Sequence, residues 1–128
     1  MQTEKVIDYI VNWLKDYATK AGVKGFVIGV SGGVDSGVVS TLCAMTGLKV
    51  LALEMPIRQQ KDQASRALEH IDFLKNKFPN VEGFTVDLNE PFEALYKTFD
   101  VKDDEFPAEK LAFANTRSRL RMLTLYYY

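Results

Sequence analysis

The chain has 128 residues, of which 47% are apolar, and its 16 Lys and Arg nearly balance 17 Asp and Glu, leaving a net charge of −1. This length suits a single domain, and the apolar fraction is too high for a disordered chain. No apolar run reaches the ~18–20 residues of a membrane helix, and the balanced charge favours neither nucleic acid nor a membrane surface as a partner. The lone cysteine, Cys43, excludes an internal disulfide and suits a reducing cytosol. The polar N-terminus lacks a secretory pattern, so we expect a cytoplasmic protein.

The first 55 residues predict two pairs of a helix followed by a strand. The expected ranges are, in chain order, 3–21, 26–30, 35–46 and 48–55. Apolar side chains recur at helical spacing in the first range, with Thr3 expected as its N-cap and Gly22 as the residue that ends it. Both expected strands are apolar almost throughout, which is typical of strands covered on both faces. Gly47 and Pro56 are expected to end the second helix and the second strand.

The remaining residues predict a helix, a strand and two further helices. The expected ranges are, in chain order, 62–78, 83–88, 91–99 and 107–128. Pro91 and Pro107 suit the first turn of a helix, and the acidic residues 100–105 are expected to form a solvated loop. The helix over 62–78 should pack one apolar face against the core. This face consists of Ala64, Ala67, Leu68, Ile71, Leu74 and Phe78.

The alternation of strands and helices predicts the α/β class, with a parallel sheet between two layers of helices. In such sheets, ligands bind at the carboxyl ends of the strands, near the point where the strand order reverses. The first expected strand ends at Val30, where a glycine-rich stretch begins. We therefore expect the functional site at this end of the sheet.

The most informative stretch is the glycine loop, Gly29-Val30-Ser31-Gly32-Gly33-Val34-Asp35-Ser36. Its glycines let the backbone turn tightly and let a ligand approach the amides closely. The following helix N-terminus adds unpaired N–H groups and a partial positive charge, and Ser31 and Ser36 add hydroxyl donors. The Asp35 carboxylate would repel a phosphate unless Mg²⁺ lay between them. The loop therefore predicts a phosphate site with Mg²⁺ on Asp35.

Other interpretations of the loop are weaker. A Walker A motif needs a lysine, and none lies between Lys24 and Lys49; the Rossmann glycine spacing is also absent. The pattern G-x-S-x-G of a hydrolase nucleophile is present, but the only histidine, His70, is expected far from this end of the sheet. A further alternative is that the loop is a tight turn that binds no ligand, although a turn does not require two adjacent glycines together with Ser, Asp and Ser.

The segment Ser31–Ser36 resembles the SGGxDS signature of the PP-loop, or N-type, ATP pyrophosphatases. The resemblance implies a Rossmann-like fold of the adenine nucleotide alpha hydrolase type. It also implies that the loop holds the pyrophosphate part of ATP while AMP is transferred to an acceptor. Members include NAD, GMP, asparagine and argininosuccinate synthetases and tRNA-modifying enzymes, and the signature alone does not choose among them.

The end of the second expected strand is similar to ammonia-dependent NAD synthetases, with Met55, Pro56 and Gln60 at matching positions. The resemblance implies that Met55 and Gln60 lie near the nucleotide. Residue types alone indicate only a buried strand followed by a solvated loop over 58–60.

A second similar stretch, Asn115–Met122, matches the N-x-[KR]-[AS]-R-x-R-M helix of that family. The resemblance implies that Arg119 contacts the dinucleotide substrate, deamido-NAD. Arg117 and Arg121 lie on another side of the helix, about 200° from Arg119. We expect these two arginines to be solvated or to form salt bridges at an interface.

The resemblance spans nearly the whole chain but only about half of an NAD synthetase. It implies that residues 1–128 are one domain, with an incomplete sheet, that forms the N-terminal half of such an enzyme. The implied reaction is the ATP-dependent amidation of deamido-NAD by ammonia, giving NAD, AMP and pyrophosphate through an acyl-adenylate. No residue is expected to act as a nucleophile, and Cys43 is expected in the core. Open alternatives are a GMP synthetase-like or tRNA-modifying PP-loop enzyme, and a nucleotide-binding module without activity.

The last expected helix ends in an apolar and aromatic group of side chains, Leu120, Met122, Leu123, Leu125, Tyr126, Tyr127 and Tyr128. Such side chains are enriched at protein interfaces. Because NAD synthetases are homodimers, the resemblance implies a symmetric homodimer that uses this helix.

Overall fold

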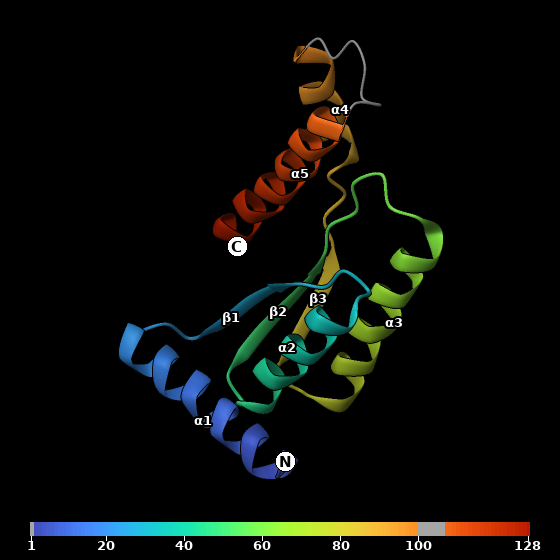
Figure 1. The fold of residues 1–128 in the computed structure, drawn as a ribbon. Helices are drawn as coiled ribbons and strands as arrows, with labels where there is room; N and C mark the ends of the chain where they lie inside the picture. The colour runs from blue at the N-terminus through green and yellow to red at the C-terminus, as the bar shows by residue number, and fades with distance from the viewer. Residues whose placement is uncertain (1, 100–106) are drawn as a thin grey trace.

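The computed structural model describes residues 2–99 and 107–128, in which helices surround a three-stranded parallel sheet (Figure 1). The elements are α1 (Thr3–Ala21), β1 (Gly25–Gly29), α2 (Val34–Met45), β2 (Lys49–Glu54), α3 (Lys61–Lys77), β3 (Val81–Thr85), α4 (Asn89–Thr98) and α5 (Pro107–Tyr127). Each expected helix and strand is confirmed, with ends that differ from the expected ones by at most three residues. The expected acidic loop lies outside the described residues.

The three strands pair in the order β1-β2-β3, and both pairings are parallel. The α/β prediction is therefore confirmed. The described strands follow chain order without a reversal, and β1 lies at one edge of the sheet. The carboxyl end of this edge strand leads into the glycine loop.

Two buried clusters, one on each face of the sheet, make up the core. The cluster against α2 and α3 is formed by Val30, Cys43, Ala44, Val50, Ala52, Ala67, Ile71, Leu74 and Val81. The cluster against α4 and α5 is formed by Leu53, Met55, Ile57, Leu88 and Phe92. Successive residues of β2 alternate between the two clusters, as the pleat of a strand requires. The expected three-layer arrangement is confirmed.

Cys43 is 4% exposed in the first cluster, and burial raises the pKa of its thiol. A raised pKa keeps the thiol protonated and weakly nucleophilic. The expectation that Cys43 is a core residue is confirmed.

Three details of the expected fold are wrong. Leu68 is 43% exposed, because the inward face of α3 is centred on Ala67 and Ile71 and Leu68 lies about 100° further round the helix. The third strand begins at Val81, two residues before the expected start. Thr3 does not cap α1: the N-cap position is Gln2, and no side chain makes the capping hydrogen bond.

Gly22 ends α1 as expected, with φ 71° in the left-handed region that glycine adopts freely. Within residues 2–99 and 107–128, none of the helices combines the length and apolar character needed to cross a membrane.

Candidate functional site

The glycine loop begins where β1 ends and is tied to β2 by a hydrogen bond of 2.8 Å from the Val30 amide to the Leu53 carbonyl. Hydrogen bonds from backbone amides of the loop to its two serine hydroxyls stabilise the turn. The Ser31 amide donates to Ser36 Oγ at 3.1 Å, and the Gly33 amide donates to Ser31 Oγ at 3.2 Å. The expected hydroxyl donors therefore also hold the backbone of the loop in place.

The N-terminus of α2 follows directly after this turn. Its N-cap residue is Gly33, and no side chain caps the helix in the described part of the chain. The amides of residues 34–36 belong to the first turn, where helix geometry offers them no carbonyl partner. Free amides together with the helix dipole favour an anion at this point.

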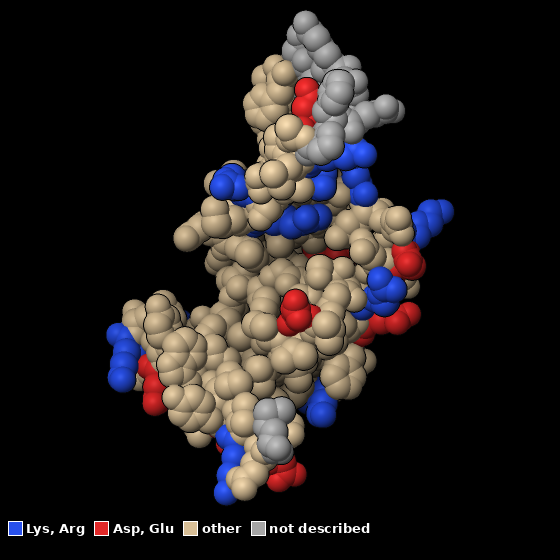
Figure 2. Space-filling model, in the orientation of Figure 1, with Lys and Arg blue, Asp and Glu red and all other residues tan. Residues whose placement is uncertain are grey.

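A cavity of about 400 Å³ lies against the loop and joins three elements that are distant in the sequence. Its walls are Gly29, Val30, Ser31, Ser36, Met55, Gln59, Ser118, Arg121, Met122 and Leu125. Figure 2 shows a hollow on this side of the molecule, with Lys and Arg side chains gathered above it. A cavity that brings one arginine, Arg121, opposite a helix N-terminus suits a phosphate-bearing ligand.

Half of the expected loop residues, namely Gly29, Val30, Ser31 and Ser36, line this cavity. Gly32, Gly33 and Val34 instead line a second cavity of about 720 Å³, which residues of α1, α2 and α3 also border. Met55 is among the walls of the first cavity, whereas Gln60 is the exposed N-cap of α3 and its neighbour Gln59 lines the cavity instead.

Arg121 is the cation that sequence reasoning missed. It is half-buried, lines the first cavity, and donates from Nε to the Met55 carbonyl oxygen at 3.0 Å. No ion pair between described residues involves it, and burial, followed by the nearby charge of Arg117, lowers its pKa. The expectation that Arg121 is solvated is therefore wrong. A signal was present, because Arg121 stands four residues before Leu125, on the packed side of α5.

Arg119 lies on a different side of α5 from this cavity. It is exposed, and its Nη1 donates to the Asn115 carbonyl of its own helix at 3.4 Å. The structure therefore does not bring Arg119 to the glycine loop. Its location leaves it available to a ligand or a chain that approaches α5 from outside.

Asp35 is exposed in the first turn of α2 and makes no hydrogen bond or ion pair with another described residue. Among the described residues, no group of three or more His, Cys, Asp and Glu side chains could hold a metal ion. Mg²⁺ is commonly held by one or two carboxylates together with the phosphates of a substrate. A single free carboxylate beside a phosphate site fits that donor set.

The geometry does not support the hydrolase interpretation. His70 pairs with Ser40, whose Oγ lies 2.9 Å from His70 Nε2 and which is completely buried. The hydroxyl of Ser31 is instead 3.1 Å from that of Ser36. The residues of the G-x-S-x-G pattern therefore have no base beside their serine in the described structure.

This parallel sheet, with a glycine loop leading from its first strand to a helix N-terminus, defines an α/β protein of the Rossmann-like PP-loop class. The family model described as NAD synthase matches residues 6–128, so the chain belongs to the NAD synthase family.

Two curated relatives and one solved structure illustrate the similarity. The NH(3)-dependent NAD(+) synthetase of Mesoplasma florum is 37% identical over 127 residues, which cover 98% of this chain and 49% of that protein. The enzyme of the same name from Finegoldia magna is 36% identical, covering 100% of this chain and 49% of its own length. The structure of an NMN synthetase from Francisella tularensis has a TM-score of 0.84 at 34% identity, and covers 100% of this chain and 50% of its own. This chain thus spans about half the length of the curated relatives it matches.

Proposed function

We propose that residues 1–128 form a PP-loop nucleotide-binding domain, the N-terminal half of an ammonia-dependent NAD synthetase, and that it binds ATP. The observation that carries the proposal is the cavity in which the glycine loop faces a half-buried arginine. Family membership and the free amides at the N-terminus of α2 support it.

In this proposal, the pyrophosphate part of ATP lies on the loop from Gly29 to Ser36, and Arg121 faces it across the cavity. Met55 and the segment with Gln59 and Gln60 lie toward the rest of the nucleotide. Asp35 would hold Mg²⁺, which offsets the charge of the phosphates when it is bound. Arg119 is assigned to the acceptor on the outer side of α5.

The proposed reaction has two steps. The carboxylate of deamido-NAD attacks the α-phosphorus of ATP and displaces pyrophosphate, forming an acyl-adenylate. Ammonia then attacks the acyl carbon, AMP leaves with the bonding electrons, and the nitrogen loses a proton to give the amide of NAD. The loop amides and Arg121 would stabilise the charge of the departing pyrophosphate, so this half contributes positioning and electrostatics rather than a nucleophile.

A binding experiment tests the nucleotide site. ATP and pyrophosphate are titrated into the 128-residue chain with and without Mg²⁺, and the same is done for Asp35→Asn and for the exposed control Asp72→Asn. We expect Mg²⁺ to strengthen binding in the parent and the control but not in Asp35→Asn. Equal dependence on Mg²⁺ in all three proteins contradicts the role of Asp35, and absence of binding in the parent contradicts the nucleotide site.

A second experiment tests which substrate accepts AMP. One matched structure is called an NMN synthetase, so AMP formation is measured with deamido-NAD, with the deamidated form of NMN and with XMP, in this chain and in the complete gene product. Arg119→Ala should raise the KM for the acceptor with little change for ATP, whereas Lys110→Ala, also on α5, should change neither. Turnover with XMP alone contradicts the proposal. ATP binding without any turnover in the complete product favours a module without activity.

The proposal also includes a symmetric homodimer formed through α5 and a cytoplasmic location. The exposed end of α5 supports the first, since Leu123 is 66% exposed and Tyr126 and Tyr127 are each 82% exposed. The single unpaired cysteine supports the second.

A further inference from the structure

The loop between β2 and α3 forms one wall of the first cavity. Met55 and Gln59 line the cavity at the two ends of this loop, while Ile57 is 2% exposed in the core cluster beneath α4 and α5. The direction in which Gln59 points therefore depends on the backbone of the residue between Ile57 and Gln59, which is Arg58.

Arg58 has a φ of 50°, and it is the only non-glycine residue with a positive φ in the described part of the chain. This conformation brings the Cβ atom of an L-residue close to its own backbone and is strained unless its surroundings hold it. An arginine is unfavourable at this position unless interactions of its own side chain stabilise the left-handed backbone.

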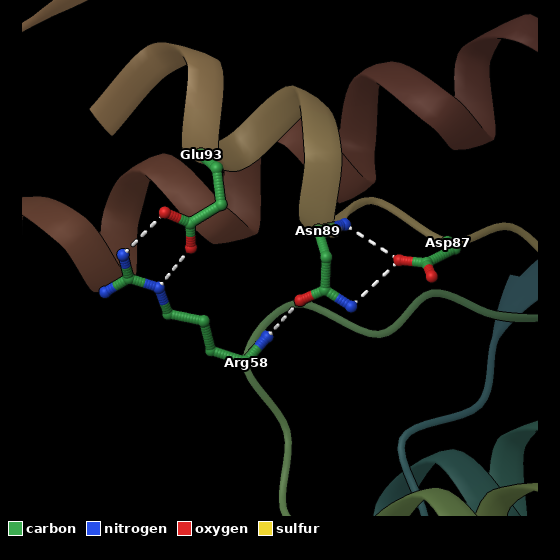
Figure 3. Close-up of polar contacts among 4 residues, drawn as sticks. All are labelled: Arg58, Asp87, Asn89 and Glu93. Carbon is green, nitrogen blue, oxygen red and sulfur yellow. Dashed lines mark hydrogen bonds and ion pairs between the residues drawn. The ribbon is translucent and has the colours of Figure 1, made fainter. Parts of the chain in front are cut away.

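The residues that hold Arg58 come from the start of α4 and the segment before it; we call Asp87, Asn89 and Glu93 the α4 clamp (Figure 3). The Arg58 guanidinium donates to both Glu93 carboxylate oxygens, from Nε at 2.7 Å and from Nη2 at 3.0 Å. The Arg58 amide donates to Asn89 Oδ1 at 2.7 Å. Both the backbone and the side chain of Arg58 are therefore fixed by the same helix.

Hydrogen bonds inside the clamp orient Asn89, and two aromatic rings contact the Arg58 guanidinium. Asp87 Oδ1 accepts from the Asn89 amide at 2.9 Å and from Asn89 Nδ2 at 2.8 Å. The Arg58 Cζ atom lies 4.4 Å from the centre of the Tyr96 ring and 5.2 Å from that of the completely buried Phe92. The hydrogen bond from Arg58 lowers the pKa of the Glu93 carboxyl, so this carboxyl stays ionised at neutral pH.

We propose that Arg58 is a positioning residue. Its pairing with the α4 clamp stabilises its left-handed backbone, and this backbone places Gln59 on the cavity wall, where Gln59 contacts the base end of the nucleotide. This inference rests on the proposed ATP site. Gln59 carries both a donor and an acceptor and can meet the polar edge of a base. In contrast, the pyrophosphate end depends on the glycine loop, which the clamp does not touch in the described contacts. The clamp therefore acts on the affinity for ATP and not on that for pyrophosphate.

The test compares Glu93→Gln with Glu90→Gln, a matched loss of one charge in the first turn of the same helix. For each 128-residue protein, ATP and pyrophosphate affinities are measured by calorimetry, and amide hydrogen exchange is followed at Arg58 and Gln59. A second pair, Arg58→Ala and Arg58→Gly, removes the guanidinium in both variants but leaves the positive φ unfavourable only for alanine.

We expect Glu93→Gln to speed exchange at Arg58 and Gln59 and to weaken ATP by about three- to fivefold, the range of a well-formed exposed ion pair, with pyrophosphate unchanged. Glu90→Gln should change neither the exchange rates nor the affinity for ATP, and Arg58→Ala should bind ATP more weakly than Arg58→Gly. Unchanged exchange in Glu93→Gln, or faster exchange with ATP affinity intact, overturns the inference. So does equal ATP affinity in the two Arg58 variants. A parent that binds ATP, with no loss of ATP affinity in Glu93→Gln, contradicts this inference alone, whereas a parent that does not bind ATP contradicts the proposed function as well.

Discussion

Gly32 has the tightest backbone surroundings in the glycine loop. Its φ is 86°, and a Cβ atom added there would lie 2.5 Å from the Gln63 carbonyl oxygen and 3.3 Å from the Ala67 amide nitrogen. Both contacts are to the backbone of α3, which cannot rotate away. The loop therefore approaches α3 so closely that only glycine fits at this position.

Gly32→Ala should lower the free energy of unfolding and weaken pyrophosphate binding. The left-handed conformation alone costs about 1–2 kcal/mol for alanine, and the contact with α3 adds to this. Gly22→Ala is the matched control, because Gly22 also has a positive φ, 71°, but no atom within 4 Å of an added Cβ. Urea unfolding measures both variants, and equal losses for the two would contradict the role given to the α3 contact.

Outside the loop, Arg121 is the residue for which a functional role is best supported. It has no acidic partner among the residues that the structure describes, and a half-buried cation of this kind is costly unless an anion binds beside it. We expect Arg121→Ala to weaken ATP and pyrophosphate by roughly tenfold or more, since hydrogen bonds to charged groups contribute about 1.5–3 kcal/mol. Arg121→Lys should recover part of the affinity, because it keeps the charge and loses the planar donor geometry. Equal affinity in the parent and Arg121→Ala, measured by titration at one salt concentration, contradicts the assignment.

At the scale of elements, α4 and α5 are joined to the sheet through Phe92. Its side chain is completely buried, its ring centre lies 6.1 Å from that of Phe113 on α5, and it belongs to the same cluster as Leu53 of β2. Aromatic side chains in this arrangement contribute both buried area and an edge-to-face contact. The packing of Phe92 thus supports α4 and, through Phe113, also α5, which borders the first cavity.

Phe92→Ala should lower the free energy of unfolding by about 3–5 kcal/mol, as is usual when a buried phenylalanine is truncated. Phe99→Ala, just after the end of the same helix, should cost far less because Phe99 is 56% exposed. Thermal and urea unfolding of the two variants give the comparison. A small loss for Phe92→Ala would mean that α4 and α5 can leave the sheet without unfolding it.

At the scale of the whole molecule, α5 has two different apolar surfaces. Phe113, Leu120 and Leu125 pack on the second core cluster. Leu123 and Tyr126 point outward and are 66% and 82% exposed. The packed surface accounts for the position of the helix in the fold, and the outward one is the surface that the proposed homodimer would bury.

Light scattering across a dilution series tests the assembly. We expect a discrete species at twice 14.5 kDa, converted to monomer by Leu123→Glu and Tyr126→Glu, because a buried charge without a partner opposes association. Tyr9→Glu on α1, at a side chain that is 71% exposed, is the control and should leave the dimer intact. A monomer at high micromolar concentration contradicts the prediction, as does open-ended aggregation.

The sequence by itself determined the order and type of the elements, the α/β class and the position of the glycine loop. These features depend on neighbouring residues: apolar spacing within a helix, short apolar runs in strands, and glycines between them. The motif Ser31–Ser36 is local in the same way and resembles the PP-loop class as a whole. The further resemblance of Asn115–Met122 pointed to the NAD synthetases, the family that the comparison then showed.

The tertiary structure alone decided which side chains share the cavity. Arg121 meets the Met55 carbonyl across 66 positions of the chain, and Arg58 meets Glu93 across 35. Such contacts depend on how α4 and α5 pack on the sheet, and no spacing within a single helix encodes that packing. For the same reason sequence reasoning placed Gln60 near the nucleotide, whereas Gln59 lines the cavity, and it expected Arg121 to be solvated, whereas Arg121 also lines the cavity. A shift of one or two residues changes the side of a loop or helix that faces the cavity.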